Sequence, residues 1–411
     1  MSKKRGVYIL GAKRTPFGKF FGSLKNFSAV ELASEAIGAL TAPFNLGLSR
    51  SDIGVDGVIL GNVLSAGLGQ APARNAMLKA GLPEHCHAVT VNKVCASSLF
   101  ALESATEKIQ LGKSGLMIAG GMESMSQAPY LLKRRLKTLE SGFEHRLDDV
   151  GYENDRGSSC PYATDSMIWD GLFNTMTPAW KVMGEFADDC AKVHNISREE
   201  QEAYAYESFM RSRIARELGR FSKQIIPVGK VDFDECPREP DIDKMRALNS
   251  VFSEDGTVTG ATSAQISDGA AVLLLGDSRT ARRLGVNTRI RLVDFVTHSQ
   301  HSHWYTTAPI DAIQKIMRRN KLKISDISFF EINEAFAVVP VFATHQLGIQ
   351  HEKVNIWGGA IAMGHPLGAS GARIVMNLTQ QLLETGGKYG IACACNGGGE
   401  AMAVLVENTP T

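Results

Sequence analysis

The stretch Trp357 to Ser370 reads WGGAIAMGHPLGAS, and it places a histidine, His365, among small and turn-forming residues. Gly364 precedes His365 and Pro366 follows it, so the backbone must turn tightly before a helix begins at Ser370. A histidine on such a turn is held at one point and can form the floor of a pocket. A loop histidine that only titrates in solvent is the other interpretation. A second turn of the same kind, which carries a cysteine, favours the first interpretation.

Two parts of the chain repeat one order of strands and helices around these turns. Strands end at Asn62 and Asn333, 271 residues apart, and helices begin at Ser97 and Ser370, 273 residues apart. A nearly constant offset indicates two copies of one domain. Alternating strands and helices with glycine turns predict an α/β fold with a mainly parallel sheet covered on both faces. The first copy has predicted strands 6–12, 55–63, 87–91 and 116–119 and helices 28–40, 71–80 and 97–111; the second has strands 329–332, 354–357, 389–394 and 401–406 and helix 370–384.

The copies differ because a long segment interrupts the first one. In the second copy a glycine run leads directly into the closing strand, whereas the matching strand at 270–275 lies far from Gly121. The intervening segment is rich in charge, methionine, tryptophan and proline, and long excursions in compact folds are usually functional. We therefore expect a lid over the site. The predicted division is an N-terminal half (1–121 and 258–282), an inserted loop or lid domain (122–257) and a C-terminal half (283–411).

Composition limits the classes of function. A chain of 411 residues is longer than a domain with a single hydrophobic core usually is, so we expect two or three folding units. A net charge of +1 provides no basic surface for nucleic acid. No apolar run approaches the roughly 18 residues that cross a membrane, and no secretory leader is recognisable, so we expect a cytoplasmic protein. Seven cysteines, an odd number, indicate free thiols in a reducing compartment. The His-Cys-His cluster at 85–87 lacks a second ligand pair, so we expect packing there and no metal site.

Cys95 is the best candidate nucleophile. It stands in the stretch NKVCASS at the N-terminal end of a helix, where free backbone N–H groups and the helix dipole favour the thiolate. A lone cysteine is more commonly a buried apolar residue. If the two copies are related by a pseudo-twofold axis, however, equivalent helix starts face each other, and Cys95 meets His365. A thiol beside an imidazole is an activated nucleophile.

Two further strand ends carry chemistry. Cys395 precedes Asn396 and a run of three glycines whose uncovered amides can stabilise an oxyanion. Cys393 points to the same side one pleat further inside, so we expect it to pack in the core. In the stretch EINEAFA, Asn333 can donate hydrogen bonds directly or through water, and we expect Glu334 to orient other groups rather than to react.

These residues lie in stretches that resemble the thiolase family, which comprises acetyl-CoA acetyltransferases and 3-ketoacyl-CoA thiolases. The matching stretches, in order, are RTPFGKFFGSL, NKVCASS, GGMESMSQAPY, NEAFA, GGAIAMGHPLGASGAR and CNGGGEA, and the likeness runs from about residue 6 to 406. The resemblance implies a duplicated, five-layered αβαβα fold with an inserted loop domain. It also implies a homodimer, or a homotetramer built of dimers.

The resemblance further implies a ping-pong reaction on coenzyme A thioesters, with no metal or separate cofactor. Cys95 takes the acyl group after His365 activates its thiol. Cys395 removes a proton from C2 of acetyl-CoA in Claisen condensation, or supplies one in thiolysis. His365 and a water held by Asn333 stabilise the thioester oxyanion, and the amides of Cys95 and Gly397 hold the tetrahedral intermediate. The activity implied is that of an acetyl-CoA C-acetyltransferase.

Departures from the family pattern concern the substrate contacts. The resemblance assigns substrate binding to Met183, Ser263, Ala264 and Phe336. Ala264 stands where many members have a serine that touches the pantetheine arm, and Val182 stands where acetoacetyl-specific members often have histidine. The segment 134–177 is also longer than usual. These changes leave the acyl-chain length open.

Two other functions remain as alternatives. A decarboxylating ketoacyl synthase of the same fold has histidine at the position of Asn333 and needs no second cysteine, so Cys395 disfavours it. A non-catalytic acyl-CoA or lipid-binding protein on the same scaffold would not need the full catalytic set. The basic run at 133–137 forms either a solvated face or a contact with coenzyme A phosphates or a neighbouring subunit.

Overall fold

The computed structural model describes residues 5–46, 53–132, 163–174, 176 and 181–409. The basic run at 133–137 and most of the long segment 134–177 lie outside these residues. The N-terminal half contains strands β1 (Val7–Arg14), β2 (Gly18–Lys19), β3 (Gly57–Gly61), β4 (His87–Val91), β5 (Leu116–Ser124) and β10 (Ser267–Asp277) and helices α1 (Ala29–Thr41), α2 (Pro72–Lys79), α3 (Ser97–Gln110) and α7 (Ser278–Arg283). The C-terminal half contains strands β11 (Ile290–Ser299), β12 (Ile327–Ile332), β13 (Tyr389–Asn396) and β14 (Glu400–Asn408) and helices α8 (Ala308–Asn320), α9 (Val338–Leu347), α10 (Ala360–Met363) and α11 (Ser370–Thr385).

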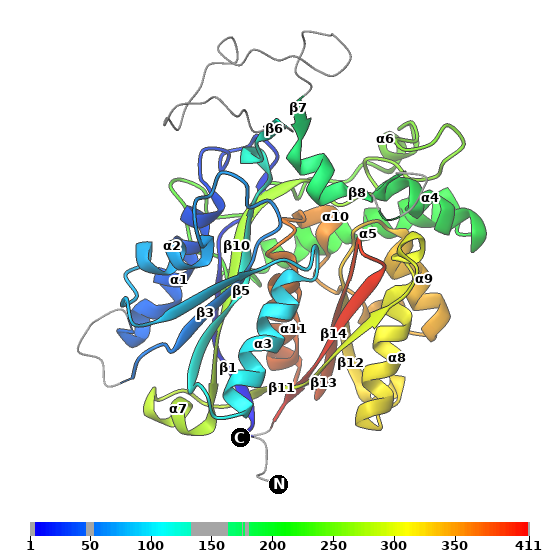
Figure 1. Cartoon of the computed structure of the whole chain (residues 1–411). Helices are drawn as coiled ribbons and strands as arrows, with labels where there is room; N and C mark the ends of the chain where they lie inside the picture. The colour runs from blue at the N-terminus through cyan, green and yellow to red at the C-terminus, as the bar shows by residue number, and fades with distance from the viewer. Residues whose placement is uncertain (1–4, 47–52, 133–162, 175, 177–180, 410–411) are drawn as a thin grey trace, which may run out of the picture.

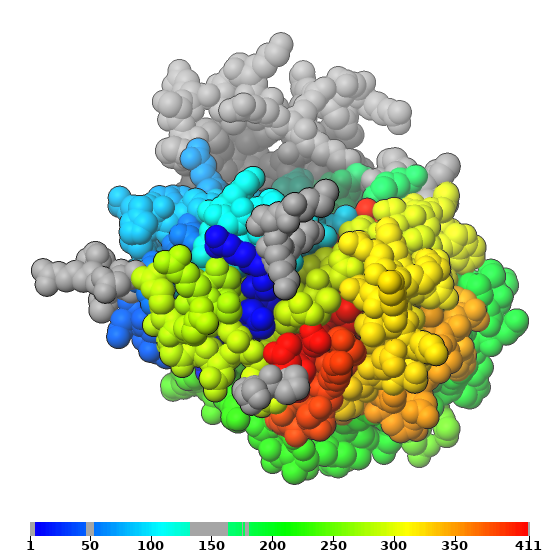
Figure 2. Space-filling view, turned by 90° about the horizontal axis from the view of Figure 1, so that it is seen from below, coloured from blue at the N-terminus to red at the C-terminus, as the bar shows by residue number. Residues whose placement is uncertain are grey.

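The strands follow the order β12-β13-β14-β11-β1-β10-β5-β3-β4. Outward from β1, the series β10, β5, β3 repeats the series β14, β13, β12 outward from β11. The two halves therefore have the same topology, as the sequence predicts, and they join where β1 and β11 pair at Val7 and Tyr8. Figure 2 shows the start of β1 (blue) next to the C-terminal strand (red) on one face of the molecule, where the halves meet.

The prediction of a mainly parallel sheet is wrong. Among the described strands, the parallel pairs are β3–β4, β3–β5 and β12–β13, whereas β1–β10, β1–β11, β2–β10, β5–β10, β11–β14 and β13–β14 are antiparallel. The reason is clearest at β13 and β14, which are separated by only Gly397 to Gly399. A parallel crossover needs a dozen or more residues, so this connection must reverse the chain.

The predicted strand at 354–357 is also wrong. Val354 forms an isolated bridge with Phe330 and no more. Asn355 and Gly358 adopt the left-handed conformation, with φ of 47° and 74°, so the chain coils before it can extend along the sheet. The second copy therefore has no full counterpart of β4 among the described residues.

Five layers result from this arrangement. Figure 1 shows α3 and α11 side by side in the middle, between the strands of the two halves, with α1 and α2 on one outer face and α8 and α9 on the other. Strands inside each half, such as β3 and β13, are buried on both faces. In β3, Ile59 packs against the central helices while Val58 and Leu60 face α1 and α2, which is the period of two expected for a strand.

The segment between β5 and β10 lies across one end of the layers, at the top of Figure 1. Its described elements are β6 (Tyr130–Leu132), β7 (Ala163–Asp165), a π-helix (Met167–Leu172), β8 (Phe173–Asn174), β9 (Lys181–Val182), α4 (Met183–Val193), α5 (Arg198–Glu217) and α6 (Ile242–Arg246). Phe186 of α4 and Phe209 of α5 are buried in the core of the C-terminal half. Since β5 continues to Ser124 and β10 begins at Ser267, the segment outside the sheet is 125–266. The division into folding units at 121 and 258 stays a prediction.

Local sequence explains where the helices begin. The Ser28 hydroxyl accepts a hydrogen bond from the Glu31 amide, and the Glu31 carboxylate accepts one from the Ser28 amide, which completes a capping box at α1. Ser197 caps α5 in the same way through the Glu200 amide. None of the described helices combines the length and apolarity that crossing a membrane requires.

Gly121 and Gly368 allow the halves to approach at the backbone, and this predicts an effect on stability. A Cβ on Gly121 would lie 1.8 Å from the carbonyl oxygen of Gly368, in the turn that follows His365. We expect Gly121→Ala to lower the free energy of unfolding by about 3 kcal/mol, since backbone cannot move aside as a flexible side chain can. Urea denaturation measures this change.

Gly38→Ala is the matched control. Gly38 lies inside α1, and a Cβ there would meet no atom within 4 Å. Alanine should raise the free energy of unfolding by about 0.5–1 kcal/mol, because it restricts the unfolded chain and favours the helix. Equal effects of the two substitutions would contradict the close approach at Gly121.

Candidate active site

A cavity of about 640 Å³ opens between the two halves and the inserted segment. Its walls are mostly apolar. Its lining includes Val94, Cys95, Val182, Met183, Val251, Phe252, Ser263, Ala264, Tyr305, Phe336, His365, Cys395 and Gly397. The structure thus places Cys95, His365 and Cys395 in the walls of one cavity, although they come from three distant parts of the sequence.

Cys95 stands on a strained turn before α3. Val94 has φ of 50°, which is rare for a β-branched residue. The Ser97 hydroxyl accepts a hydrogen bond from the Lys93 amide at 2.8 Å and donates one to the Val94 carbonyl at 2.6 Å, and the Asn92 side chain accepts one from the Val94 amide. These bonds hold the strain and present the thiol to the cavity.

The Cys95 thiol is not stabilised as a thiolate, contrary to the expectation from the helix start. Burial raises the pKa of Cys95 to about 12, and the hydrogen bond from its own amide opposes that rise only in part. The nearby Glu123 carboxylate adds to the rise. Cys95 therefore rests as a thiol and needs a base to become a nucleophile.

His365 is well placed to be that base. Gly364, with φ of 105°, makes the tight turn that the sequence predicts, and the His365 amide donates to the carbonyl of Gln265. Burial, together with the positive charge of Arg373, lowers the pKa of His365 to about 3. The imidazole is therefore neutral near pH 7 and can accept a proton.

Ser370 has a role that sequence reasoning missed. The sequence predicts only a helix start there, but Ser370 is the first residue of α11 and makes no cap. Its hydroxyl lies 2.6 Å from Nδ1 of His365 and donates to the carbonyl of Pro366 at 2.9 Å. A serine five residues after a turn histidine is the signal that could have identified this contact.

Glu123 was also missed, although its stretch carries the family resemblance. This fully buried carboxylate accepts hydrogen bonds from the Asn62 side chain and from the amides of Val63, Leu64 and Gly368. Burial raises the pKa of Glu123 to about 7 against the effect of these bonds. Because Gly368 belongs to the His365 turn, Glu123 ties that turn to the N-terminal half.

Asn333 lies directly behind His365. Its Nδ2 is 3.4 Å from Nε2 of His365, and its Oδ1 accepts from Arg373 at 3.4 Å. Glu334 turns the other way, where its carboxylate accepts hydrogen bonds from Tyr204, Ser208, Asn355 and the amide of Ile361. This is the orienting environment that the sequence predicts for Glu334.

Cys395 lies at the end of β13 and is almost fully buried. Burial, followed by the neighbouring Cys95 and Cys393 thiols, raises the pKa of Cys395 well above its ordinary value. Cys393 shares the same face of the strand but packs in the core, as predicted. Gly397 follows in the cavity wall, and none of the hydrogen bonds found among the described residues uses its amide as a donor.

The four predicted substrate contacts all line the cavity. Ser263 forms an isolated bridge with Phe336, and its hydroxyl donates to the carbonyl of Thr259, so it is occupied by the protein. Ala264 and Val182 present only apolar groups to the cavity. Tyr305 donates to the Met183 carbonyl at 3.0 Å, which fixes the start of α4 in the wall.

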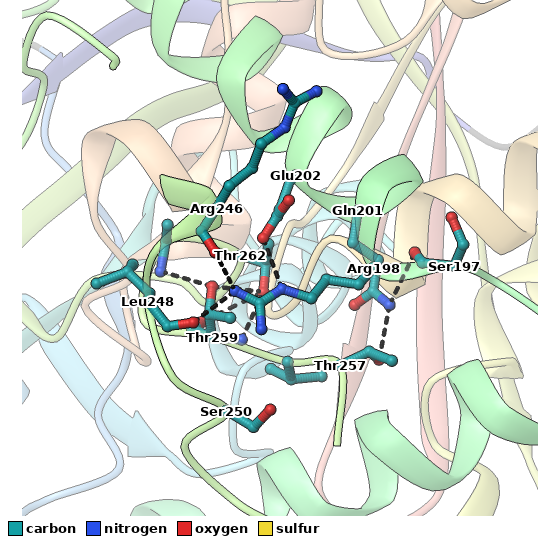
Figure 3. A network of polar contacts seen from close by, with 12 residues as sticks. Ser197, Arg198, Gln201, Glu202, Arg246, Leu248, Ser250, Thr257, Thr259 and Thr262 are labelled. Atoms are coloured by element: carbon teal, nitrogen blue, oxygen red, sulfur yellow. Dashed lines mark hydrogen bonds and ion pairs between the residues drawn. The ribbon is translucent and has the colours of Figure 1, made fainter. Parts of the chain in front are cut away.

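A polar network supports the part of the cavity wall that Val251 and Phe252 form. Figure 3 shows the Arg198 guanidinium between the Glu202 carboxylate and the carbonyls of Arg246 and Leu248. Next to it, the Gln201 side chain donates to the hydroxyl of Thr257. These contacts attach the segment 246–257, which contributes Val251 and Phe252 to the cavity, to the first turn of α5.

Both halves of the chain match known family descriptions. Residues 7–279 match "Thiolase, N-terminal domain" and residues 286–408 match "Thiolase, C-terminal domain". The chain belongs to the thiolase family. The predicted family and fold class are thereby confirmed.

Relatives of this thiolase match it over nearly its whole length. It is 41% identical to acetyl-CoA acetyltransferase 2 of Arabidopsis thaliana, over 98% of this chain and 97% of that one. It is 39% identical to the mitochondrial acetyl-CoA acetyltransferase of Bos taurus, over 98% and 91%. The solved structure of human mitochondrial 3-ketoacyl-CoA thiolase in complex with CoA superposes with a TM-score of 0.89 at 31% identity, covering 99% of this chain and 98% of that one.

Among the described residues of this thiolase, no three His, Cys, Asp or Glu side chains gather in a group that could hold a metal ion. At the cluster 85–87, Cys86 is fully buried in the core of the N-terminal half. Its carbonyl accepts a hydrogen bond from Arg74. These contacts are those of a packed strand start.

The network around Arg198 predicts a local effect on flexibility. We expect the double substitution Arg198→Met and Glu202→Gln to speed hydrogen–deuterium exchange of the 247–257 amides by about tenfold, because two hydrogen bonds to carbonyls are lost. Mass spectrometry of the exchanged protein measures this. Glu202→Gln alone keeps the Arg198 bonds to Arg246 and Leu248 and should leave exchange unchanged. Unchanged exchange in the double variant would show that other contacts hold the segment.

Proposed function

We propose that this thiolase is an acetyl-CoA acetyltransferase, which joins two acetyl-CoA molecules by Claisen condensation and catalyses the reverse thiolysis. The observation that carries the proposal is the meeting of Cys95, His365 and Cys395 in one cavity, with Asn333 behind the imidazole. Two sulfurs and a base meet the demand of a reaction that needs one group to carry the acyl chain and another to move a proton at C2.

In the first step, Sγ of Cys95 attacks the carbonyl carbon of acetyl-CoA while Nε2 of His365 takes the thiol proton. The carbon–sulfur bond to coenzyme A then breaks, and His365 returns the proton to the leaving thiolate. The amides of Cys95 and Gly397 hold the tetrahedral oxyanion, and a water held by Asn333 with His365 holds the thioester oxygen of the second acetyl-CoA.

In the second step, Cys395 as the thiolate takes the proton from C2 of that acetyl-CoA, and the carbanion attacks the acetyl group on Cys95. The carbon–sulfur bond to Cys95 then breaks, acetoacetyl-CoA is released, and the Cys95 thiolate takes back a proton from His365. The raised pKa keeps Cys395 protonated at rest, which suits the thiolysis direction, where it protonates C2 of the departing acetyl-CoA. In condensation its proton must first pass to a base. Neutral His365 is the base in the same cavity.

The cavity walls support a coenzyme A thioester as the substrate. A volume of about 640 Å³ is ample for an acetyl group, and the remainder suits the pantetheine arm. Met183, Ser263, Ala264 and Phe336 are the proposed substrate contacts. Ala264 and Val182 offer no hydrogen bond to the ligand from their side chains, and their amides already donate to the Ala335 carbonyl and the Glu185 carboxylate. We propose that apolar contact holds the arm there.

We also propose a homodimer, or a tetramer of such dimers. Strand β4 ends the strand order, pairs only with β3 among the described strands, and leaves Val89 45% exposed. An exposed edge of this kind can pair with that of a second copy. Light scattering on the purified chain tests the stoichiometry. The cytoplasmic location stays a prediction, since a mitochondrial relative is among those found.

The electrostatics of the cavity predict an acylation step that is insensitive to pH. His365 is the free base above about pH 3, and Cys95 is a thiol below about pH 12, so neither titrates between these limits. From about pH 5.5 to about 8.5, neither group should give the initial rate of Cys95 acetylation by acetyl-CoA a tenfold-per-unit slope, and Glu123, whose pKa is raised to about 7, should add at most a shallow dependence. Quenched-flow mass spectrometry measures the rate. A sigmoidal loss centred near the ordinary histidine pKa would contradict a neutral His365.

Substitution of the two sulfurs separates their roles. Cys95→Ala should form no acyl-enzyme with acetyl-CoA. Cys395→Ala should still acylate but should lose roughly 10³-fold in thiolysis of acetoacetyl-CoA, which is the usual contribution of a general acid or base. Equal loss of acylation in both variants would refute this division.

Cys393→Ala is the matched control, because Cys393 lies on the same face of β13 but outside the cavity. It should retain turnover within a few fold and lose only stability. A thiolysis series over acyl-chain length, run beside these variants, measures the substrate preference. Activity with malonyl-CoA but not acetyl-CoA as the extender would instead favour a ketoacyl synthase.

A further inference from the structure

Four side chains, including that of His365, form a continuous chain of hydrogen bonds that ends at a backbone carbonyl. Arg373 lies next to Oδ1 of Asn333, Nδ2 of Asn333 next to Nε2 of His365, Nδ1 of His365 next to Ser370, and Ser370 next to the carbonyl of Pro366. All four side chains are more than nine-tenths buried. With bulk solvent excluded, a contact that opposes two donors or two acceptors along this chain is costly, although Nε and Nη1 of Arg373 have no hydrogen-bond acceptor among the described residues.

Both ends of this chain have a fixed polarity. A guanidinium has only donors, and a backbone carbonyl has only lone pairs. Starting at Arg373, Asn333 must present its oxygen to the guanidinium and its N–H₂ group to His365. Nε2 of His365 must then be the acceptor, so that a neutral ring carries its proton on Nδ1. The Ser370 oxygen then accepts a hydrogen bond from Nδ1–H, and the Ser370 hydroxyl donates one to the carbonyl of Pro366.

We infer that Arg373 and Ser370 are positioning residues that lock His365 in its Nδ1–H tautomer, so that the unprotonated Nε2 can exchange its long 3.4 Å contact with Asn333 for the proton of the Cys95 thiol. This inference rests on the proposed role of His365 as the base. Neither residue needs to contact the substrate. Each acts through the imidazole, and together they determine which ring nitrogen can take a proton.

The opposite tautomer, with the proton on Nε2, would meet a conflict in either orientation of the Asn333 amide. A proton on Nε2 would face the N–H₂ group of Asn333, and turning that amide over would point its N–H₂ group at the Arg373 guanidinium. Each arrangement opposes two donors in a buried site, which carries the full penalty of an unsatisfied group. A doubly protonated imidazolium meets the same conflict at Nε2, so the chain also favours the neutral ring.

The hydrogen-bond distances indicate whether Ser370 or Arg373 contributes more to the tautomer preference of His365. The Ser370 contact is short, at 2.6 Å, whereas the contacts of Arg373 with Asn333 and of Asn333 with His365 are both 3.4 Å. A hydrogen bond weakens steeply at the longer distance. Ser370 should therefore carry most of the tautomer preference, and Arg373 should contribute a smaller part through the amide.

Arg373 keeps its place because a buried partner balances its charge. Glu331 lies two residues before Asn333 in β12, so both side chains leave the same face of the strand. Its Oε2 is 3.6 Å from Nη1 of Arg373, and its Oε1 accepts from Gln381. The pair is fully buried, and removing the cation would leave a buried carboxylate behind.

The test combines a spectroscopic and a kinetic measurement on the full-length protein. With ¹⁵N-labelled histidine, the His365 signals, assigned by their loss in His365→Asn, should show protonated Nδ1 and unprotonated Nε2. Ser370→Ala should shift the tautomer equilibrium toward Nε2–H and slow Cys95 acetylation by at least about tenfold with little change in KM. Ser370→Thr, which keeps the hydroxyl, should restore both.

Arg373→Gln allows the Asn333 amide to turn over, because glutamine can accept as well as donate. It should slow acetylation less than Ser370→Ala does, and Arg373→Lys, which retains a donor without an acceptor, should stay closer to the unsubstituted enzyme. If Arg373→Gln fails to fold, the Ser370 series alone decides.

Thr344→Ala is the matched control for Ser370→Ala. The Thr344 hydroxyl donates to the carbonyl of Pro340, which is also a proline four residues earlier, and no hydrogen bond between this hydroxyl and a histidine is found among the described residues. This variant should leave both measurements unchanged. An Nε2–H tautomer in the unsubstituted protein, or an unshifted tautomer and unchanged rate in Ser370→Ala, would overturn the inference. Absence of acetylation in the unsubstituted protein would instead count against the proposed function, since the tautomer is read without substrate.

Discussion

The active cavity depends on one close backbone approach between the two halves of the chain. The turn after His365 lies against the ends of β3 and β5, and Gly368, Gly121 and Gly61 meet there with no room for a side chain. Glu123 then accepts the Gly368 amide and secures the turn. Without this contact, the imidazole of one half would not reach the thiol of the other.

Burial decides the charge state of the groups brought together there. A helix start stabilises a negative charge by about 0.3–1 kcal/mol, and up to about 2 kcal/mol in favourable cases. The rise in the pKa of Cys95 from 9.0 to about 12 corresponds to about 4 kcal/mol in the opposite direction. Desolvation therefore wins, and the cavity holds a neutral thiol and a neutral base. Charge develops only when a substrate supplies the carbonyl that the amides of Cys95 and Gly397 can stabilise.

The sequence predicted the duplication, the inserted segment and most strands and helices, because a constant offset and the periods of two and 3.6 are visible along one chain. That pattern does not show whether neighbouring strands are parallel or antiparallel. It also does not show that the predicted strand at 354–357 fails to form. Cys95, His365 and Cys395 could be chosen because turns and helix starts constrain their neighbours. Glu123 and Arg373 could not, since a charged residue within an apolar segment does not reveal which distant group will face it. Their partners belong to other elements.

The two helix starts show what duplication has made possible. Ser97 begins α3 and Ser370 begins α11, and each hydroxyl donates to a carbonyl of the preceding turn, Val94 in one case and Pro366 in the other. Each also makes a second contact. Ser97 accepts from a backbone amide and so holds a strained turn that presents a thiol, whereas Ser370 lies beside an imidazole nitrogen. One serine therefore secures the backbone that carries the nucleophile while its counterpart contacts the side chain of the base, so that a symmetric scaffold produces an asymmetric pair of reacting groups.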